Sequence, residues 1–225
     1  MNHGMVRLYS YWRSSAAYRV RIALNLKGIA YETVPVNLAR DGGEQHRPAF
    51  NDLNPQELVP VLLHGNRILR QSMAIMEYLD ETFPSPPLMP ATARDRQRVR
   101  MIAQSIACEI HPLNNLRVLQ FFEKTWSVPQ AERDEWVRHW IRTGFEALED
   151  TLADNPSTGT FCDGEQPTMA DCCLVPQVFN AERFGVDMAP YHTIRRVVQA
   201  CLALDEFQAA RPENQPDAPK GGGGN

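Results

Sequence analysis

The sequence predicts a mixed α/β domain followed by an all-α domain. In the first part of the chain, short segments with strand-like alternation of apolar residues are interspersed with amphipathic helical segments. Residues 83–90 are then so rich in proline that no helix can continue through them. Beyond this stretch only long helical periodicities remain, and the first is marked by Val99, Ile102, Ile106 and Ile110. We therefore expect a domain over residues 1–84, a linker over 85–91, a helical domain over 92–208 and a disordered tail over 209–225.

Composition excludes several classes of protein. Hydrophobic residues make up 43% of the chain and charged residues 22%, and the formal net charge is -4, so a basic surface for nucleic acid is not expected. The sequence contains neither a run of about 18 apolar residues nor the apolar core of a secretory signal. Its 5 cysteines, without a C-x-x-C pair, indicate reduced thiols and predict neither a disulfide framework nor a metal site. We expect a soluble, cytoplasmic protein with no membrane or nucleic-acid partner.

Ser14 and Ser15 stand between a strand predicted over residues 6–9 and a helix predicted over residues 15–27. Hydroxyl groups and free backbone N–H groups at a helix N-terminus can stabilise an anion, and a thiolate suits such a place. Helix capping alone also explains a serine here. Gly28 is placed to end the helix in a left-handed conformation. On the helix surface a buried stripe is predicted at Tyr18, Ile22 and Leu26, while Arg19, Arg21 and Lys27 are expected to reach water or a ligand.

The remaining N-terminal segments predict a thioredoxin-like sheet. A strand over residues 30–36 follows the first helix, and a tight turn joins two further strands over residues 61–63 and 67–69. Pro60 must lie at the start of its strand, because it cannot donate to the ladder. A trans bond is the usual state there, and a cis bond would expose the Val59 backbone to a ligand. The next helix is expected to begin with Ser72 as its N-cap.

In the second domain, Pro112 should interrupt the first long helix and expose the polar groups of residues 111–117. An amphipathic helix is predicted over residues 135–152 and a final helix over residues 191–204. Between them, Thr168 and Asp171 form a capping box. Arg183 stands in the last turn of the helix that this box begins, where a basic residue by default interacts with the helix dipole.

These motifs together resemble the zeta class of glutathione transferases, and within it the bacterial maleylacetoacetate isomerases. The resemblance rests on the string Tyr11-Trp12-Arg13-Ser14-Ser15 with its helix, and on the segments 111–117, 168–171 and 181–184, and it extends from residue 6 to about 207. The class usually reads Ser-Ser-Cys-Ser-Trp-Arg at the first motif, whereas Ala16, Ala17 and Tyr18 follow the serines here. Serine-assisted glutathione chemistry is therefore implied, and cysteine redox chemistry at this position is not.

The resemblance implies a thioredoxin-like N-terminal domain that binds glutathione, an all-α glutathione transferase C-terminal domain that shapes the substrate pocket, and a homodimer. Glutathione is the implied cofactor. The implied catalytic residues are Ser14, Ser15 and Arg19, with Ser14 the first choice for the contact with sulfur. The residues implied to bind glutathione are Ser14, Ser15, Gln45, Val59, Gln71, Ser72, His111 and Asn115. Those implied to bind the carboxylates of a small dicarboxylate substrate are Arg13, Arg117 and Arg183, because guanidinium groups pair with carboxylates through two donors.

The implied reaction is the glutathione-dependent cis-trans isomerisation of maleylacetoacetate to fumarylacetoacetate, a step of tyrosine and phenylalanine catabolism, by reversible thiolate addition. Maleylpyruvate isomerase is an alternative, although the resemblance leads us to expect a further arginine where Leu116 stands. A transferase acting on α-halo acids is a second alternative. A scaffold without enzymatic activity would be expected to lose the serine motif and the Gln71-Ser72 pair, and both are kept.

Overall fold

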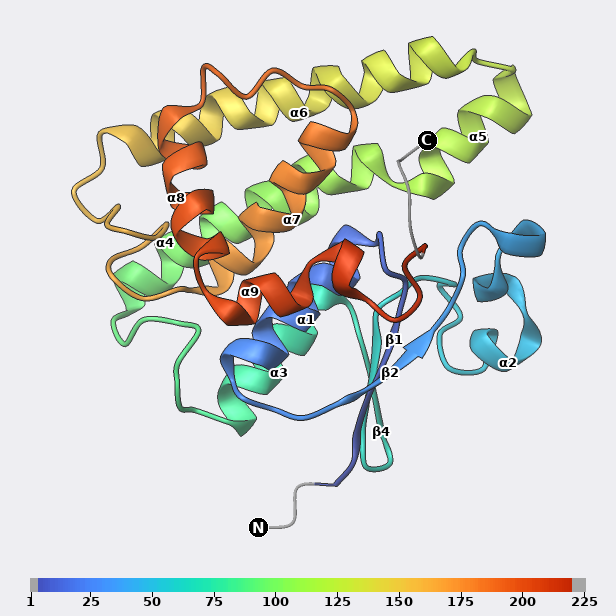
Figure 1. Ribbon diagram of the computed structural model, residues 1–225, viewed down its shortest axis with the longest axis horizontal. Coiled ribbons are helices and arrows are strands. Elements are labelled where there is room, and N and C mark those ends of the chain that lie inside the picture. The colour runs from blue at the N-terminus through green and yellow to red at the C-terminus, as the bar shows by residue number, and fades with distance from the viewer. Residues whose placement is uncertain (1–3, 220–225) are drawn as a thin grey trace. The chain divides into compact units, whose positions relative to one another are not determined.

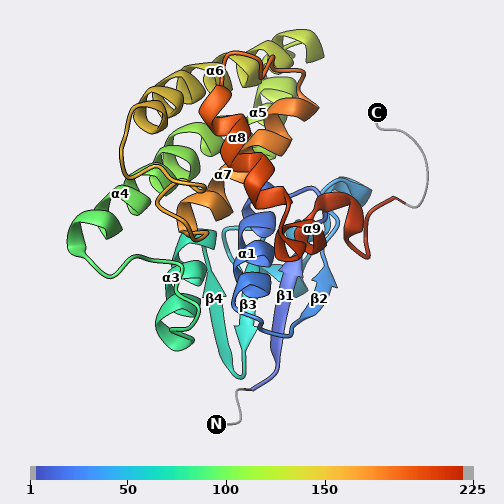
Figure 2. The same ribbon diagram turned by 60° about the vertical axis from the view of Figure 1, so that its left-hand side comes forward.

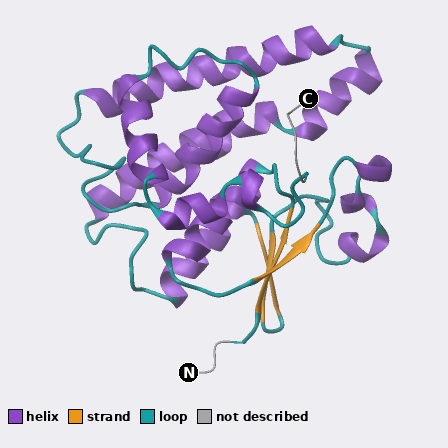
Figure 3. Cartoon of the chain, in the orientation of Figure 1, coloured by secondary structure: helices purple, strands orange, loops and turns teal. Residues whose placement is uncertain are grey.

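The computed structural model describes residues 4–219 (Figure 1). Its internal contacts divide the chain into two units. The N-terminal unit contains the described residues up to Pro87 together with those from Leu204 onward, and the C-terminal unit is Leu88–Ala203. Among the described residues, strands occur in the N-terminal unit and the C-terminal unit is helical (Figure 3). The predicted order of a mixed α/β part and an all-α part is therefore confirmed.

The sheet of the N-terminal unit has the strand order β2-β1-β3-β4. β1 (Val6–Ser10) pairs in parallel with β2 (Glu32–Pro35) and antiparallel with β3 (Val61–His64), which forms a hairpin with β4 (Arg67–Arg70). Leu8 sits in the middle of β1, opposite Thr33 on one side and Leu62 on the other, and is fully buried. A βαβ unit followed by a hairpin is the predicted thioredoxin-like arrangement.

Two helices cover one face of this sheet and a short helix lies on the other. α1 (Ser15–Leu26) and α3 (Ser72–Thr82) pack on the same side, and α2 (Pro48–Asn51) on the opposite side (Figure 1). The core between sheet and helices is aliphatic and includes Val20, Ile22, Leu62, Ile75 and Leu79. α9 (Asp205–Ala210), from the far end of the chain, lies beside α1 (Figure 2).

Arg19 and Arg21 of α1 and Lys27 at its C-cap were expected to reach water or a ligand; all three are buried from water, and contact with a ligand stays a prediction. Arg19 is 2%, Arg21 0% and Lys27 7% exposed. Each is enclosed because polar groups from other segments surround it. Lys27 Nζ, for example, donates to an Asp80 carboxylate oxygen (2.5 Å) and to the carbonyls of Phe83 and Pro86. At the end of α1, Gly28 has φ 63, which confirms the predicted left-handed residue.

The C-terminal unit is built around α7 (Met169–Arg183), which packs against α4 (Ala93–Gln104) and α8 (His192–Leu202) (Figure 2). α6 (Gln130–Ala153) packs against α8 and contains the predicted helix over 135–152. The predicted capping box is confirmed: Asp171 Oδ2 accepts from the Thr168 backbone N–H (2.8 Å), and the Thr168 hydroxyl caps the first turn of α7. Asp171 is fully buried and satisfied within the unit.

Pro112 interrupts the first long helix as predicted. α4 passes into a π-helical segment η3 (Ser105–Ile110), then into a 3-10 turn η4 (His111–Asn114), before α5 (Leu116–Trp126) begins. Exposure of the polar groups was expected throughout this region, but Asn114 is only 7% exposed. Neither polar atom of its side-chain amide has a hydrogen-bond partner among the described residues.

The last part of the chain differs from the predicted tail over 209–225. The predicted final helix over 191–204 ends at Leu202, and α9 and a 3-10 turn η5 (Pro212–Asn214) follow it within the N-terminal unit. Gln215 is 9% exposed because its side-chain amide donates to the carbonyls of Ala209 and Arg211. Within residues 209–219, Ala210, Pro212 and Gln215 are buried, and residues 220–225 of the predicted tail lie outside the described residues.

Candidate active site

The serine loop, residues 11–15, leads from β1 into α1. Ser14 is the N-cap, with φ -70 and ψ 116, and its Oγ accepts a hydrogen bond from the Ala17 N–H at 3.2 Å. A hydroxyl has two lone pairs and one hydrogen, so this cap leaves the hydrogen available to donate. Ser15 begins the helix and is 8% exposed, whereas Ser14 is half-buried. The capping and the anion-binding interpretations of Ser14 are therefore compatible in one side chain.

Arg13 precedes the serines and is half-buried. Its guanidinium carbon lies 5.4 Å from the centre of the Trp12 ring. Stacking on an aromatic face restricts a guanidinium while leaving its N–H donors at the edge for a carboxylate. The structure thus places Arg13 beside the predicted sulfur-binding serines in the chain, next to an aromatic support.

Arg19 and Ser72 join the N-terminal regions of α1 and α3. Arg19 Nη1 donates to Ser72 Oγ at 3.2 Å, and both residues are buried. Ser72 is the first residue of α3 and not its N-cap, so that prediction is wrong. Gln71 occupies the cap position instead, with a left-handed φ of 70 that is unusual for a residue other than glycine. The helix N-terminus with its unpaired N–H groups suits a carboxylate.

Gln45 lies in η2 (Glu44–His46) and is 5% exposed. Its Nε2 is 3.0 Å from His46 Nε2, and His46 Nδ1 is 2.7 Å from a Glu57 carboxylate oxygen. Since the carboxylate accepts from Nδ1–H, neutral His46 presents Nε2 as an acceptor, which fixes the Gln45 amide with its nitrogen toward the ring. Gln45 Oε1 is buried without a partner among the described residues. An orphaned acceptor of this kind fits a ligand that donates an N–H group.

Gly43 keeps the space around this amide open. A Cβ at this position would stand 2.4 Å from Gln45 Nε2, and the φ of 107 is itself in the region that favours glycine. On the neighbouring segment, Val59 is 7% exposed and precedes Pro60 at the start of β3. The Val59–Pro60 peptide bond is cis, not the usual trans state.

The other predicted site residues belong to the C-terminal unit. His111 lies in η4, and Asn115 is the N-cap of α5, where its Oδ1 accepts from the Arg117 N–H at 3.1 Å. The structure therefore brings His111, Asn115 and Arg117 together at one helix junction, and the Arg117 side chain is exposed. Arg183 is exposed at the end of α7, with its guanidinium carbon 4.4 Å from the centre of the Phe184 ring and one nitrogen 3.2 Å from Asn180 Oδ1.

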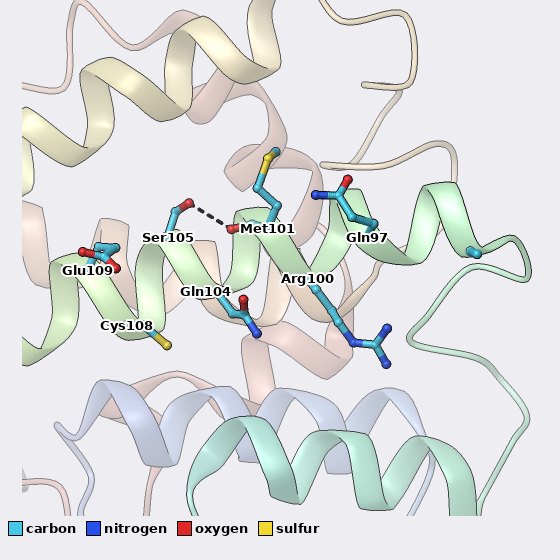
Figure 4. Close-up of a pocket in the computed structure, with 8 residues that line it drawn as sticks. Gln97, Arg100, Met101, Gln104, Ser105, Cys108 and Glu109 are labelled. Atoms are coloured by element: carbon cyan, nitrogen blue, oxygen red, sulfur yellow. Dashed lines mark hydrogen bonds between the residues drawn. The ribbon is translucent and has the colours of Figure 1, made fainter.

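A groove of about 550 Å³ lies along α4 and η3 (Figure 4). It is lined by Ala93, Gln97, Arg100, Met101, Gln104, Ser105, Cys108 and Glu109, none of which is a predicted site residue. Within it, the Ser105 hydroxyl donates to the Met101 carbonyl at 2.9 Å, a bond internal to the helix.

The buried thiols of Cys162 and Cys201 are unsuited to nucleophilic chemistry. Burial raises the pKa of Cys162 well above its usual value, the nearby Asp171 carboxylate adds to this effect, and the pKa of Cys201 is raised by the same two causes in the same order. Residues 4–219 contain no group of three or more His, Cys, Asp or Glu side chains arranged to hold a metal ion. No helix within the same residues is long and apolar enough to cross a bilayer.

Sequence reasoning missed the residues that support the site. His46 and Glu57 orient Gln45, and only the contact between them reveals this, because 11 residues separate them. Arg21 donates to the carbonyl of Trp12 (3.0 Å), and Asp217 accepts from the Trp12 N–H (2.9 Å). No local signal marks Asp217, which lies in a stretch whose composition predicts disorder.

Comparisons with known proteins show the family of the chain. The family model for the glutathione S-transferase N-terminal domain matches residues 8–87, and the model for the C-terminal domain matches residues 130–208. A probable maleylacetoacetate isomerase from Vibrio cholerae is 52% identical over 94% of this chain and 97% of its own length. The holo structure of a maleyl pyruvate isomerase, a bacterial glutathione S-transferase of the zeta class, has a TM-score of 0.92 at 48% identity and covers 95% of this chain and 100% of its own. The crystal structure of maleylacetoacetate isomerase from Methylobacterium extorquens AM1 with bound malonate and GSH has a TM-score of 0.91 at 44% identity. The match covers 95% of this chain and 99% of that one.

Proposed function

Because the chain belongs to the zeta class of the glutathione transferases, we propose that it catalyses the glutathione-dependent cis-trans isomerisation of maleylacetoacetate to fumarylacetoacetate. The observation that carries the proposal is the serine at the N-cap of α1 in the same unit as the Arg19–Ser72 contact at the start of α3. The first provides a donor for a thiolate, and the second provides a cation and a helix N-terminus for a carboxylate. Glutathione carries both of these groups.

When bound, glutathione supplies a thiolate that adds reversibly to the cis alkene, so that the bond can rotate before the thiolate leaves. Ser14 holds that charge: its hydroxyl donates one hydrogen bond while its lone pair caps α1. The positive end of the α1 dipole adds to the stabilisation of an anion at this place. Ser15, whose exposure is 8%, is the second serine proposed to contact the tripeptide.

The residues present fit the tripeptide. Gln45 Oε1 is a buried acceptor without a partner among the described residues, and it suits a peptide N–H of glutathione. Gln71 and Ser72 at the α3 N-terminus are proposed to hold the γ-glutamyl end, and the Val59 backbone to pair with the peptide. His111 and Asn115 are proposed as further contacts from the C-terminal unit.

Three arginines are proposed to bind the substrate carboxylates. Arg13 is held against the Trp12 ring, Arg183 stacks on the Phe184 ring, and Arg117 is exposed in the first turn of α5. Guanidinium groups suit this task because each offers paired donors and stays charged at all physiological pH values. Arg117 and Arg183 are exposed and Arg13 is half-buried.

Maleylpyruvate is the second candidate substrate, because a maleyl pyruvate isomerase is among the similar structures. The residue that follows Asn115 bears on the choice between maleylacetoacetate and maleylpyruvate as substrate. A further arginine is expected there in maleylpyruvate isomerases, whereas this chain has Leu116, which is 39% exposed and offers no charge. The apolar side chain favours maleylacetoacetate, and α-halo acids remain a third class for the test.

The proposed reaction is a step of tyrosine and phenylalanine catabolism, and we propose that it takes place in the cytoplasm. The enzyme is proposed to act as a homodimer, as members of this class commonly do. Sedimentation of the purified chain tests the oligomeric state separately from the reaction.

The proposed function is tested by following the isomerisation of maleylacetoacetate and maleylpyruvate side by side, with and without glutathione. We expect turnover only with glutathione, a higher kcat/KM for maleylacetoacetate, and a fall of about 100-fold or more in Ser14→Ala if the hydroxyl stabilises the thiolate in the rate-limiting step. Arg7→Met, an exposed change in β1, is the control variant and should behave as the wild type. Turnover without glutathione, or of neither substrate, would refute the proposal.

A further inference from the structure

The backbone N–H and the backbone carbonyl of Trp12 are each bonded to a side chain, and these two side chains are far apart in sequence. Its N–H donates to Asp217 Oδ2 at 2.9 Å, and its carbonyl accepts from Arg21 Nη2 at 3.0 Å. Trp12 lies two residues before Ser14 in the serine loop. The N–H and the carbonyl of Trp12 belong to the two successive peptide groups on either side of its Cα, so the two bonds together restrict the φ and ψ of Trp12 where the loop approaches α1.

Arg21 is a buried connector between the serine loop and α9. Its exposure is 0%, and Nη1 donates to Ser10 Oγ at 3.1 Å. Its Nε donates to the carbonyl of Ala210, the last residue of α9, at 3.0 Å. Burial lowers the pKa of Arg21 to about 10, so the guanidinium stays charged at neutral pH. One cation thus uses separate nitrogens to bind β1, the serine loop and the C-terminal segment.

The C-terminal segment that reaches the serine loop is anchored along its length. We call residues 204–219 the C-terminal clamp. Asn25 Nδ2 of α1 donates to the Glu206 carbonyl at 2.8 Å, and Phe207 and Ala210 are fully buried. After α9, Gln215 bonds back to two carbonyls, and Asp217 follows two residues later. The clamp therefore delivers a carboxylate to the Trp12 N–H from a fixed support.

Asp217 makes a charge-assisted contact with the loop. The Trp12 N–H is its donor, and the second carboxylate oxygen is shielded from solvent without a hydrogen-bond partner among the described residues. The positive Arg21 guanidinium compensates this charge electrostatically. Bonds between an N–H group and an ionised acceptor are stronger than neutral ones, so Asp217 contributes more to the order of the loop than a neutral side chain would.

We propose that the C-terminal clamp is a positioning device for the thiolate site, in which Asp217 fixes the backbone N–H of Trp12 and Arg21 its carbonyl, so that the Ser14 hydroxyl and the Arg13 side chain are held in place. Asp217 touches no reacting atom and acts through the loop. Without it, the loop samples other conformations and the Ser14 hydroxyl meets the thiolate less often. The inference rests on the proposed function, because it concerns the same serine.

The first test measures the loop without any ligand. Hydrogen exchange of the peptide covering residues 8–17, followed by mass spectrometry, should be faster in Asp217→Ala than in the wild type. Asp217→Asn should recover most of the protection, because its amide oxygen still accepts from the Trp12 N–H. Glu213→Ala is the matched control, since Glu213 is a clamp carboxylate that pairs with Arg211. Unchanged exchange in Asp217→Ala would overturn the proposal whether or not the protein binds glutathione.

The second test measures the pKa of the bound glutathione thiol from the ultraviolet absorbance of the thiolate. We expect Asp217→Ala to raise this pKa by roughly 0.5 to 1 unit, a loss of about three- to tenfold in thiolate at low pH, with a melting temperature close to that of the wild type. Asp217→Asn should lie between the two. If exchange rises but the thiol pKa stays the same, the clamp does not position the serine and the inference is wrong. A wild type that binds no glutathione would instead refute the proposed function, and the exchange result would still decide whether the clamp orders the loop.

Discussion

Arg19 donates a hydrogen bond of 3.2 Å to the Ser72 hydroxyl and thereby ties the second turn of α1 to the first residue of α3. Both side chains are buried, and 53 residues separate them in sequence. A buried cation next to a helix N-terminus strengthens the positive potential that a carboxylate would meet there. We therefore propose that Arg19 supports the carboxylate end of glutathione, and its predicted help to the thiolate stays a prediction.

Replacing Arg19 should weaken glutathione binding. Arg19→Met keeps the apolar part of the side chain and removes the charge and its donors. We expect the dissociation constant to rise by about ten- to 100-fold, because a hydrogen bond to a charged group contributes roughly 1.5–3 kcal/mol. Isothermal titration calorimetry measures the change. Arg7→Met, which removes an exposed pair with Glu32, should leave binding as it is, and equal losses in both variants would contradict the role given to Arg19.

Ser14 can be separated into its two roles by a matched pair of substitutions. Ser14→Gly keeps an acceptable N-cap at a cost of a few tenths of a kcal/mol, whereas Ser14→Ala costs about 1 kcal/mol. Both remove the hydroxyl. We expect different melting temperatures but the same rise in the pKa of bound glutathione. A normal thiol pKa in Ser14→Gly would assign the sulfur contact to Ser15 instead, and Ser15→Ala would then reproduce the loss.

The Glu57–His46 pair predicts a pH dependence of stability. The hydrogen bond with His46, and to a lesser extent that with Asn51, lowers the pKa of Glu57 below its usual value. A lowered carboxyl pKa stabilises the fold above the ordinary carboxyl value, and this contribution disappears as the pH falls through the folded-state pKa. Melting temperatures measured between pH 6 and 3 should therefore fall more steeply below about pH 4.3 in the wild type than in Glu57→Gln.

Glu81→Gln, at an exposed position of α3, provides the control for this change. The melting temperature of this variant should fall with decreasing pH as steeply as that of the wild type. Glu57→Gln should in addition weaken glutathione binding, because the new amide can face His46 Nδ1 with either its accepting oxygen or its donating nitrogen, so that the tautomer is no longer fixed and the Gln45 amide can turn. If the melting temperatures of Glu57→Gln and the wild type fall equally steeply at acidic pH, the Glu57–His46 pair contributes nothing to the pH dependence of stability.

Removing a side chain of the α7 capping box should lower the free energy of unfolding far more than removing an exposed helix cap. In Asp171→Ala, the N–H groups of Cys162 and Thr168 lose their acceptor inside the unit. Each unsatisfied buried donor costs about 1–3 kcal/mol, so we expect a loss of roughly 3–5 kcal/mol in the free energy of unfolding. Thr92→Ala removes the exposed cap of α4 and should cost about 0.5–1 kcal/mol. Chemical denaturation of both variants gives the comparison, and similar losses would contradict it.

Cysteine labelling tests the burial of the C-terminal unit. Cys108 is exposed, whereas Cys162, Cys172, Cys173 and Cys201 are buried. A maleimide reagent at neutral pH should therefore modify one thiol in the native protein and all 5 after denaturation, as counted by intact mass spectrometry. Rapid labelling of a second cysteine in the native protein would show that the packing around α7 is looser than described.

Patterns that depend on neighbouring residues could be predicted from the sequence. The N-cap at Ser14, the left-handed Gly28, the hairpin before β4 and the Thr168–Asp171 box each rest on residues within a few positions of one another. Local chemistry decides such features, because a cap or a turn is satisfied by its own segment. The exception is Ser72, where the left-handed Gln71 takes the cap position and the serine bonds to Arg19 instead.

The sequence by itself determined the order of a mixed α/β part and an all-α part, and the motifs of its candidate site. Only the tertiary structure decided which polar groups are buried and what satisfies them. From the sequence, Arg21 is predicted to be an exposed cation on a helix and Asp217 to be part of a polar tail. In the folded chain, Arg21 bonds the backbone carbonyl of Trp12 and Asp217 bonds its N–H. The reason is physical: an isolated segment satisfies its polar groups with water, whereas a folded chain must supply partners for those that it buries.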